Sequence, residues 1–136
     1  MKRNLIVFSV LALGMLVAAG PVGAHHAFFG TFDLTTPVTF EGVITNVEWA
    51  NPHIAFTVDV KDEHGKITNW RFEGAAPGAL RTRGWIRTDL KNGDKVKVEG
   101  YRAKNGVFVA AAGAVTLADG RTLSAASDGV PAVKGK

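Results

Sequence analysis

The sequence contains no cysteine, and its only serines are Ser9, Ser124 and Ser127, all near the two ends. No disulfide can therefore stabilise the fold, and no lipid can be attached through a cysteine. A nucleophilic serine or cysteine is missing from the whole central part of the chain, which argues against a Ser-His-Asp type of hydrolase. No glycine-rich phosphate loop and no H-E-x-x-H pattern is present either. We therefore expect a binding or structural module and no enzyme.

Apolar runs are also few: the longest lies at the start, and a shorter one covers residues 107–117. Lys2 and Arg3 precede an apolar stretch over residues 5–19, which ends at a Gly-Pro pair and is followed by small residues up to Ala24. This pattern predicts a secretory signal peptide over residues 1–24, cleaved after Ala24. A membrane anchor is the alternative, but a spanning helix needs about 20 apolar residues. We expect a periplasmic or secreted protein with no integral membrane segment after cleavage.

A strong excess of charge of one sign is lacking once the signal peptide is removed. The remaining 112 residues, enough for one domain, carry 14 basic and 12 acidic side chains. The densest basic stretch, residues 81–97, is interrupted by Asp89 and Asp94. This pattern favours a solvated face over a nucleic-acid surface. We expect an envelope protein or a small ligand as partner and no nucleic acid.

Alternation of apolar and polar residues predicts five strands. The first spans residues 38–49, and its apolar positions change from even to odd numbers across Gly42, which predicts a β-bulge at that glycine. The second and third, residues 54–61 and 66–73, flank a hairpin turn. The fourth and fifth cover residues 95–99 and 107–117, and a short returning stub at 121–123 follows the fifth.

One short helix is predicted between the third and fourth strands. Pro77 suits a first helical turn, and Gly84 suits the left-handed residue of a Schellman cap that joins Leu80 to Trp85. Three strands, a helix and two strands is the order of the OB fold. The sequence therefore predicts an all-β class, a small OB-like five-stranded barrel over residues 37–123. A sandwich would ordinarily need about seven strands.

The segments on either side of this domain differ in composition. Residues 25–36 contain Phe28, Phe29 and Phe32, so we expect this N-terminal segment to pack on the domain. Residues 124–136 are rich in Ala, Ser, Gly and Lys, and such a composition predicts a disordered tail.

Histidine is the residue type that points to a ligand. Cleavage after Ala24 would make His25 the N-terminal residue, which offers an imidazole and an α-amine whose usual pKa lies near 7.7–8.0. His26 adds a second imidazole, and nitrogen ligands of this kind favour Cu²⁺ among divalent ions. His53, at the turn between the first two strands, completes a candidate metal site if the N-terminal segment folds back. The alternative is that these histidines follow a cleavage site and fill a turn, and His64 lies in a charged turn.

Tryptophans and phenylalanines fall mainly in phase with the strands and are expected in the core. Trp49 stands at a strand end beside Asn51 and His53. These three residues form a candidate ligand pocket for a small apolar or glycan ligand.

Several motifs together resemble a family of small exported proteobacterial proteins known as a domain of unknown function. The most distinctive are His-His-Ala-Phe at residues 25–28 and Trp-Ala-Asn-Pro-His at residues 49–53, and the likeness extends to about Leu123. The resemblance implies export, a small β domain and that His25, His26 and His53 belong to the shared pattern of the family, but no activity. The resulting hypothesis is a periplasmic binding module with a candidate copper site. The alternative is a structural or protein-interaction module of the envelope without a small-molecule ligand.

Overall fold

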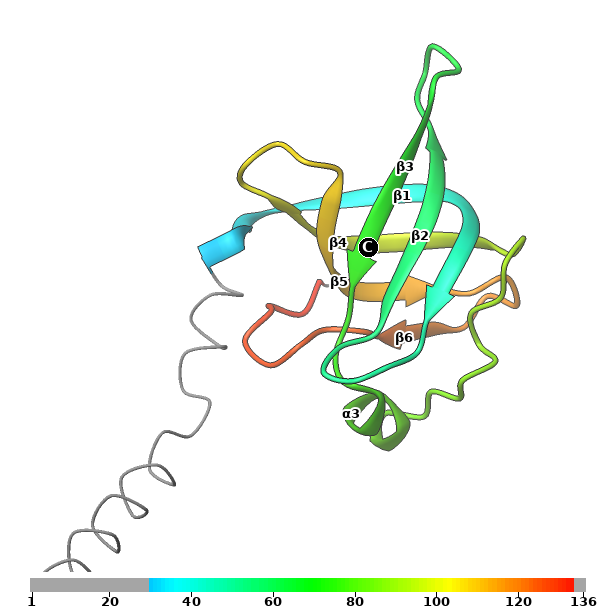
Figure 1. Cartoon of the computed structure of the whole chain (residues 1–136), viewed down its shortest axis with the longest axis vertical. Coiled ribbons are helices and arrows are strands. Elements are labelled where there is room, and N and C mark those ends of the chain that lie inside the picture. Colours follow the sequence, from blue (N-terminus) through cyan, green and yellow to red (C-terminus); the bar gives the residue numbers. More distant parts are fainter. Residues whose placement is uncertain (1–29, 134–136) are drawn as a thin grey trace, which may run out of the picture. The chain divides into compact units, whose positions relative to one another are not determined.

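The computed structural model describes residues 30–133. Six strands form one sheet in the order β3-β2-β1-β4-β5-β6, and β3 also pairs with β5. The strands are β1 (Phe32–Glu48), β2 (Ala55–Lys61), β3 (Ile67–Glu73), β4 (Lys95–Ala103), β5 (Val109–Thr116) and β6 (Thr122–Ser124). All neighbours are antiparallel except β3 and β5, which are parallel and close the sheet into a ring (Figure 1). The fold is thus mostly β, as predicted.

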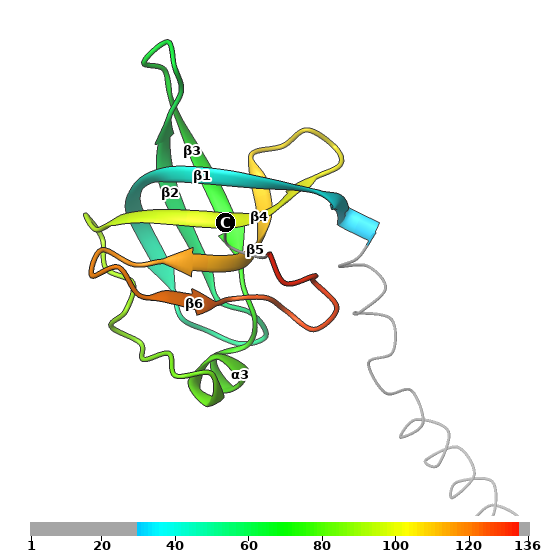
Figure 2. The same ribbon diagram turned by 180° about the vertical axis from the view of Figure 1, so that it is seen from behind.

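Strand β1 is long because it serves two neighbours. Its first part pairs with β4 up to Val43, and its last part pairs with β2 from Gly42 onward. The strand bends where it changes partner, as Figures 1 and 2 show from opposite sides. The predicted bulge at Gly42 is wrong, because the register shift lies between Ile44 and Asn46. Ile44, like Phe40, is buried at an even-numbered position. The alternation of inward and outward side chains therefore shifts by one residue only after Ile44.

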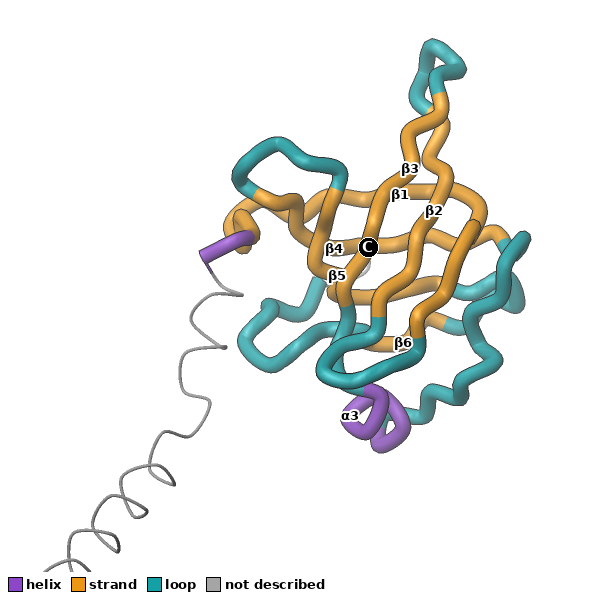
Figure 3. The backbone as a smooth tube through the Cα atoms, in the orientation of Figure 1, coloured by secondary structure: helices purple, strands orange, loops and turns teal. Residues whose placement is uncertain are grey.

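Helix α3 (Pro77–Thr82) lies between β3 and β4, as predicted. The Trp85 amide donates to the Leu80 carbonyl at 3.1 Å, and the Gly84 amide donates to Arg81 at 3.1 Å. Gly84 has a φ of 89°. These are the two bonds of a Schellman cap, and both Leu80 and Trp85 are fully buried beneath it. The helix is visible at one end of the ring in Figure 3.

The core fills the inside of the ring with apolar side chains from all five long strands and from the helix. Aromatic rings pack in its centre, where the Phe40 and Trp70 centroids are 4.5 Å apart and those of Phe56 and Phe72 are 5.4 Å apart. The largest fully buried members include Phe56, Phe72, Trp85, Ile44, Ile54, Leu80, Val58, Val98 and Val115. The expectation that most aromatic residues belong to the core is therefore confirmed.

The structure differs from the sequence-based expectation in the segment after β6. Residues 124–133 pack on the sheet, with Ala125 and Val130 buried. The Ala75 amide donates to Ala125 at 2.8 Å, and the Ala125 amide donates to Gly113 at 3.0 Å. The small side chains that suggest disorder are the ones that allow this close approach. The predicted signal peptide (residues 1–24) lies outside the described residues. So do residues 25–29 of the N-terminal segment and the last three residues, 134–136.

Candidate functional site

The predicted pocket residues lie on one short loop between β1 and β2. Trp49 is half-buried and packs against Trp85, with ring centroids 6.4 Å apart. Trp85 is held by the cap of α3, and its indole N–H donates to the Ser124 carbonyl at 2.8 Å. The indole N–H of Trp49, by contrast, is buried without an acceptor among the described residues. Since an unsatisfied buried donor costs about 1–3 kcal/mol, this group is suited to an added acceptor.

Asn51 and His53 follow Trp49 on the same loop, where the Asn51–Pro52 peptide bond is cis. Asn51 is exposed and His53 is half-buried. His25 and His26, the other two predicted metal ligands, lie outside the described residues. Within residues 30–133, no cluster of three or more His, Asp or Glu side chains is placed to hold a metal ion. The copper site therefore stays a prediction.

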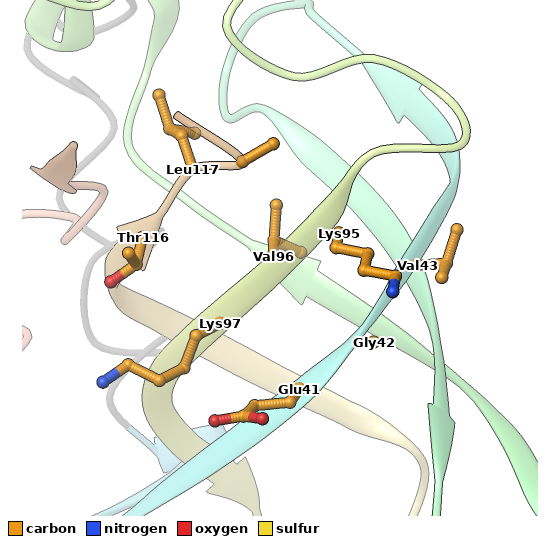
Figure 4. A pocket seen from close by; sticks show the side chains of 9 residues that line it. Glu41, Gly42, Val43, Lys95, Val96, Lys97, Thr116 and Leu117 are labelled. Atoms are coloured by element: carbon orange, nitrogen blue, oxygen red, sulfur yellow. The ribbon is translucent and has the colours of Figure 1, made fainter. Parts of the chain in front are cut away.

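A pocket of about 510 Å³ lies elsewhere, where β1, β4 and the end of β5 run side by side. Three short stretches line it: residues 41–43, 95–97 and 116–118. The register explains this meeting, because Lys97 pairs with Glu41 on one side and with Thr116 on the other. Figure 4 shows Glu41, Lys97 and Thr116 turned the same way from neighbouring strands. The size falls within the range of small-molecule sites, about 300–1,000 Å³.

The lining of this pocket combines an apolar surface with a few charged groups. Val43, Val96 and Leu117 supply the apolar part. Lys95 is exposed and Lys97 is half-buried, and neither forms an ion pair with any described residue. Glu41 also lines the pocket, so two lysines stand against one glutamate. An apolar wall with this net positive charge suits a small molecule that joins a hydrophobic body to an anionic group.

A second hollow of about 310 Å³ is built around a buried carboxylate. The Asp89 side chain is only 2% exposed; it accepts the Ile86 amide at 2.8 Å and Arg121 at 2.7 Å. Arg121 also binds Asp119 at 2.8 Å. Backbone and side-chain hydrogen bonds from Arg121 hold the pKa of Asp119 below its ordinary value. Arg121 thus binds two carboxylates and joins the loop after α3 to the turn before β6.

The outer face of β1, β2 and β3 carries a second set of matched polar groups. Arg71 holds Glu48 through two bonds of 2.9 and 3.0 Å, and this contact lowers the pKa of Glu48. Asn69 donates to Asp59 at 2.7 Å and to Thr45 at 3.0 Å. Lowered carboxyl pKa values are opposite to the raised value that a general acid needs. These contacts are cross-strand side-chain pairs that stabilise the sheet.

Sequence reasoning missed the β1–β4–β5 pocket. Alternating Lys and Val in a strand predicts lysines in water, and the basic stretch over residues 81–97 therefore favours a solvated face. No local pattern joins residues 41–43, 95–97 and 116–118. Only the strand order brings them together.

Comparison with known proteins gives a family but no activity. The model of a family of unknown function, DUF6152, matches residues 13–112, most of the chain. Among the curated proteins none matches significantly. In the part of the chain that the structure describes, no helix has the length and apolar character needed to cross a membrane.

Proposed function

Since the chain belongs to DUF6152, a family of unknown function, its function has to be argued from its own residues, and we propose an exported binding module of OB-like fold for a small anionic, partly apolar ligand. The observation that carries this proposal is the pocket between β1, β4 and β5. Export is proposed on the basic start, the apolar run and the small residues before His25.

The pairing pattern supports the OB-like part of the proposal. Five strands close a ring in the order β1-β2-β3-β5-β4, with a helix between β3 and β4. A long first strand that bends and serves two neighbours is what a five-stranded Greek-key barrel requires. The sixth strand, of only three residues, extends β5 outside this ring.

The pocket chemistry supports the ligand class. Val43, Val96 and Leu117 would contact the apolar body of the ligand. The ammonium groups of Lys95 and Lys97 would attract its anionic group, because the one carboxylate of the lining, Glu41, lies opposite Lys97 in the register but forms no ion pair with either lysine. The proposal includes no reaction.

Anilinonaphthalene sulfonate combines an aromatic body with an anionic group and serves as the probe. We expect its fluorescence to rise in the presence of the folded, exported protein. A Lys95→Gln/Lys97→Gln variant should bind it about tenfold more weakly, the equivalent of about 1.4 kcal/mol. A Lys61→Gln/Lys104→Gln variant, which loses two exposed lysines elsewhere, should bind it as well as the wild type. Equal weakening in both variants, or no fluorescence change with the wild type, contradicts the proposal.

A second candidate function is copper binding through His25, His26 and His53. The position of His53, half-buried on the β1–β2 loop, is the observation behind it. An imidazole from this loop would join the α-amine and imidazoles of the cleaved N-terminus, a nitrogen set that suits Cu²⁺.

Cu²⁺ added to the exported protein tests this candidate and cleavage together. Native mass spectrometry should give the mass of residues 25–136 and one bound copper. A His25→Ala/His26→Ala variant should lose at least about tenfold in affinity by calorimetry, or about 1.4 kcal/mol. His64→Ala, which removes a histidine from the exposed hairpin turn, is the control and should bind normally. Equal uptake by all variants would exclude the site.

The structural or interaction role remains the alternative. It is favoured by Val107 and Phe108, which are 47% and 54% exposed in the loop before β5. A protein partner retained in the presence of a chelator, together with failure of both ligand tests, would support it.

A further inference from the structure

Two turns of the protein contain the same three residues in the same order. Lys91-Asn92-Gly93 lies just before β4, and Lys104-Asn105-Gly106 follows directly after it. Both asparagines and both glycines are exposed. Each glycine has a positive φ, 91° at Gly93 and 78° at Gly106. The two turns thus offer a comparison in which the local chemistry is matched and the surroundings differ.

An Asn-Gly pair is prone to deamidation, because glycine has no Cβ to shield its backbone nitrogen from the side chain before it. This nitrogen loses its proton to solvent and attacks the asparagine Cγ. The N–Cγ bond forms, the Cγ–Nδ2 bond breaks, and Nδ2 leaves as ammonia with a proton from solvent. Water then opens the succinimide ring at either of its two carbonyl groups and gives aspartate or isoaspartate. The reaction consumes water, releases ammonia and needs no oxidant.

In the first turn, strand β1 holds the attacking nitrogen. The Gly93 amide donates to the Ile44 carbonyl at 2.8 Å, and the Ile44 amide donates to the Asp94 carbonyl at 2.9 Å. These two bonds fasten the turn to β1 on both sides of one residue. To approach Asn92, the Gly93 nitrogen has to leave the Ile44 carbonyl, and the adjoining bond opposes that local opening.

In the second turn, the attacking nitrogen is held only within its own loop. The Gly106 amide donates to the Ala103 carbonyl at 3.4 Å, longer than the usual range of about 2.7–3.2 Å. A second contact, from the Val107 amide to Asn105 Oδ1 at 3.3 Å, is also long and does not involve the nitrogen that leaves. This loop, between β4 and β5, projects from the ring in Figures 1 and 2.

We propose that Asn105 is a site of spontaneous deamidation, whereas β1 protects the matched Asn92. The reaction converts an exposed amide into a carboxylate in the loop that holds Val107 and Phe108, which are 47% and 54% exposed. The new negative charge lies next to Lys104, and the isoaspartate product also adds a methylene group to the backbone of the loop. Deamidation therefore changes the charge and the shape of this exposed apolar surface.

Peptide mapping by mass spectrometry measures both sites in one sample of the folded, exported protein kept in mildly alkaline buffer. We expect Asn105 to deamidate at least about tenfold faster than Asn92, a difference of about 1.4 kcal/mol between the two barriers. In concentrated urea the two rates should become similar, because unfolding removes the bonds to β1 and leaves two identical Lys-Asn-Gly sequences. The product at Asn105 should contain both aspartate and isoaspartate, since direct hydrolysis of the side chain would give aspartate alone.

A pair of variants assigns the product to its residue. Glutamine closes a larger ring and does so more slowly, so Asn105→Gln should remove the rapidly formed product and Asn92→Gln should retain it. Both positions are exposed, and urea denaturation checks that both variants fold. Similar rates at the two sites of the folded protein, a difference that persists in urea, or aspartate as the sole product at Asn105 overturns the proposal. The pocket and copper tests are independent of these results.

Discussion

At the scale of single residues, Gly42 permits the change of partner in β1. A Cβ atom added there would overlap the carbonyl oxygen of Asp59 and lie 2.7 Å from a Val58 methyl group. The φ of Gly42 is not in the left-handed region, so the requirement for glycine comes from space alone. Gly100 is similar, because its added Cβ would overlap the carbonyl oxygen of Ala111. Both glycines allow neighbouring strands to approach where the ring curves.

We therefore expect Gly42→Ala to lower the free energy of unfolding by about 2–3 kcal/mol, the usual cost of inserting an atom where the backbone cannot move aside. Gly78→Ala is the control. Gly78 lies in α3 with nothing within 4 Å of an added Cβ, and alanine is the better helix former by about 1 kcal/mol. Urea denaturation of both variants measures the difference. If the Gly42→Ala protein were as stable as Gly78→Ala, β1 and β2 would not approach each other at Gly42 as closely as the structure shows.

The sequence could indicate that Gly42 is special but not why. An apolar residue occurs on each side of the change in phase, and Val43 and Ile44 look equally suited to the core. The structure buries Ile44 at 1% exposure and leaves Val43 at the rim of the pocket. The extra residue is Thr45, whose hydroxyl is bonded to Thr57 at 2.7 Å on the outer face. This contact joins residues twelve positions apart, which no local pattern of the sequence reveals.

At the scale of elements, the sequence predicts correctly those turns and caps that are stabilised by contacts between residues close together in the chain. The Schellman cap joins Leu80 to Trp85, and the β2–β3 hairpin extends outward from a short turn that brings Lys61 opposite Ile67; both lie where the sequence predicts them. The fifth strand was predicted from Val107, whereas β5 begins at Val109. Two exposed apolar residues in a loop cannot be distinguished by pattern from the start of a strand.

The segment after β6 was mistaken for a disordered tail because its role depends on distant partners. Arg83 donates to the Ala126 carbonyl, and Ser127 donates to the Gly74 carbonyl at 3.0 Å. Val133 lies against Gly113 of β5. The composition of this segment predicts too little apolar surface for packing, but composition carries no information on the hydrogen bonds that the segment forms with other loops.

A pair of substitutions distinguishes a packed segment from a free one. Ala125 is fully buried, so Ala125→Asp should destabilise the protein by at least about 3 kcal/mol, since an unpaired charge is placed in the interior. Ala132 is exposed in the same segment, and Ala132→Asp should change stability by less than about 0.5 kcal/mol. The free energy of unfolding in urea is the measurement. Similar values for the two variants would indicate that residues 125–132 do not pack.

At the scale of the whole molecule, the candidate sites differ in how far they could be predicted. The β1–β2 loop was found from sequence because Trp49, Asn51 and His53 are neighbours in the chain. The pocket was not found, because residues 41–43, 95–97 and 116–118 meet only after the strands have assembled.

Closure of the ring has a consequence for the timing of folding. Residues 71–73 pair with residues 109–111, so the chain has to complete α3, the following loop and β4 before the parallel contact can form. Contacts between such distant residues favour folding in milliseconds to seconds over the microseconds of helical bundles. The last turns of the polypeptide are also needed, because Ala125 bonds to both Ala75 and Gly113. The sheet therefore cannot complete its assembly while the C-terminal end is still held in a ribosome or translocation channel. Such a delay would keep the chain unfolded during the export proposed above.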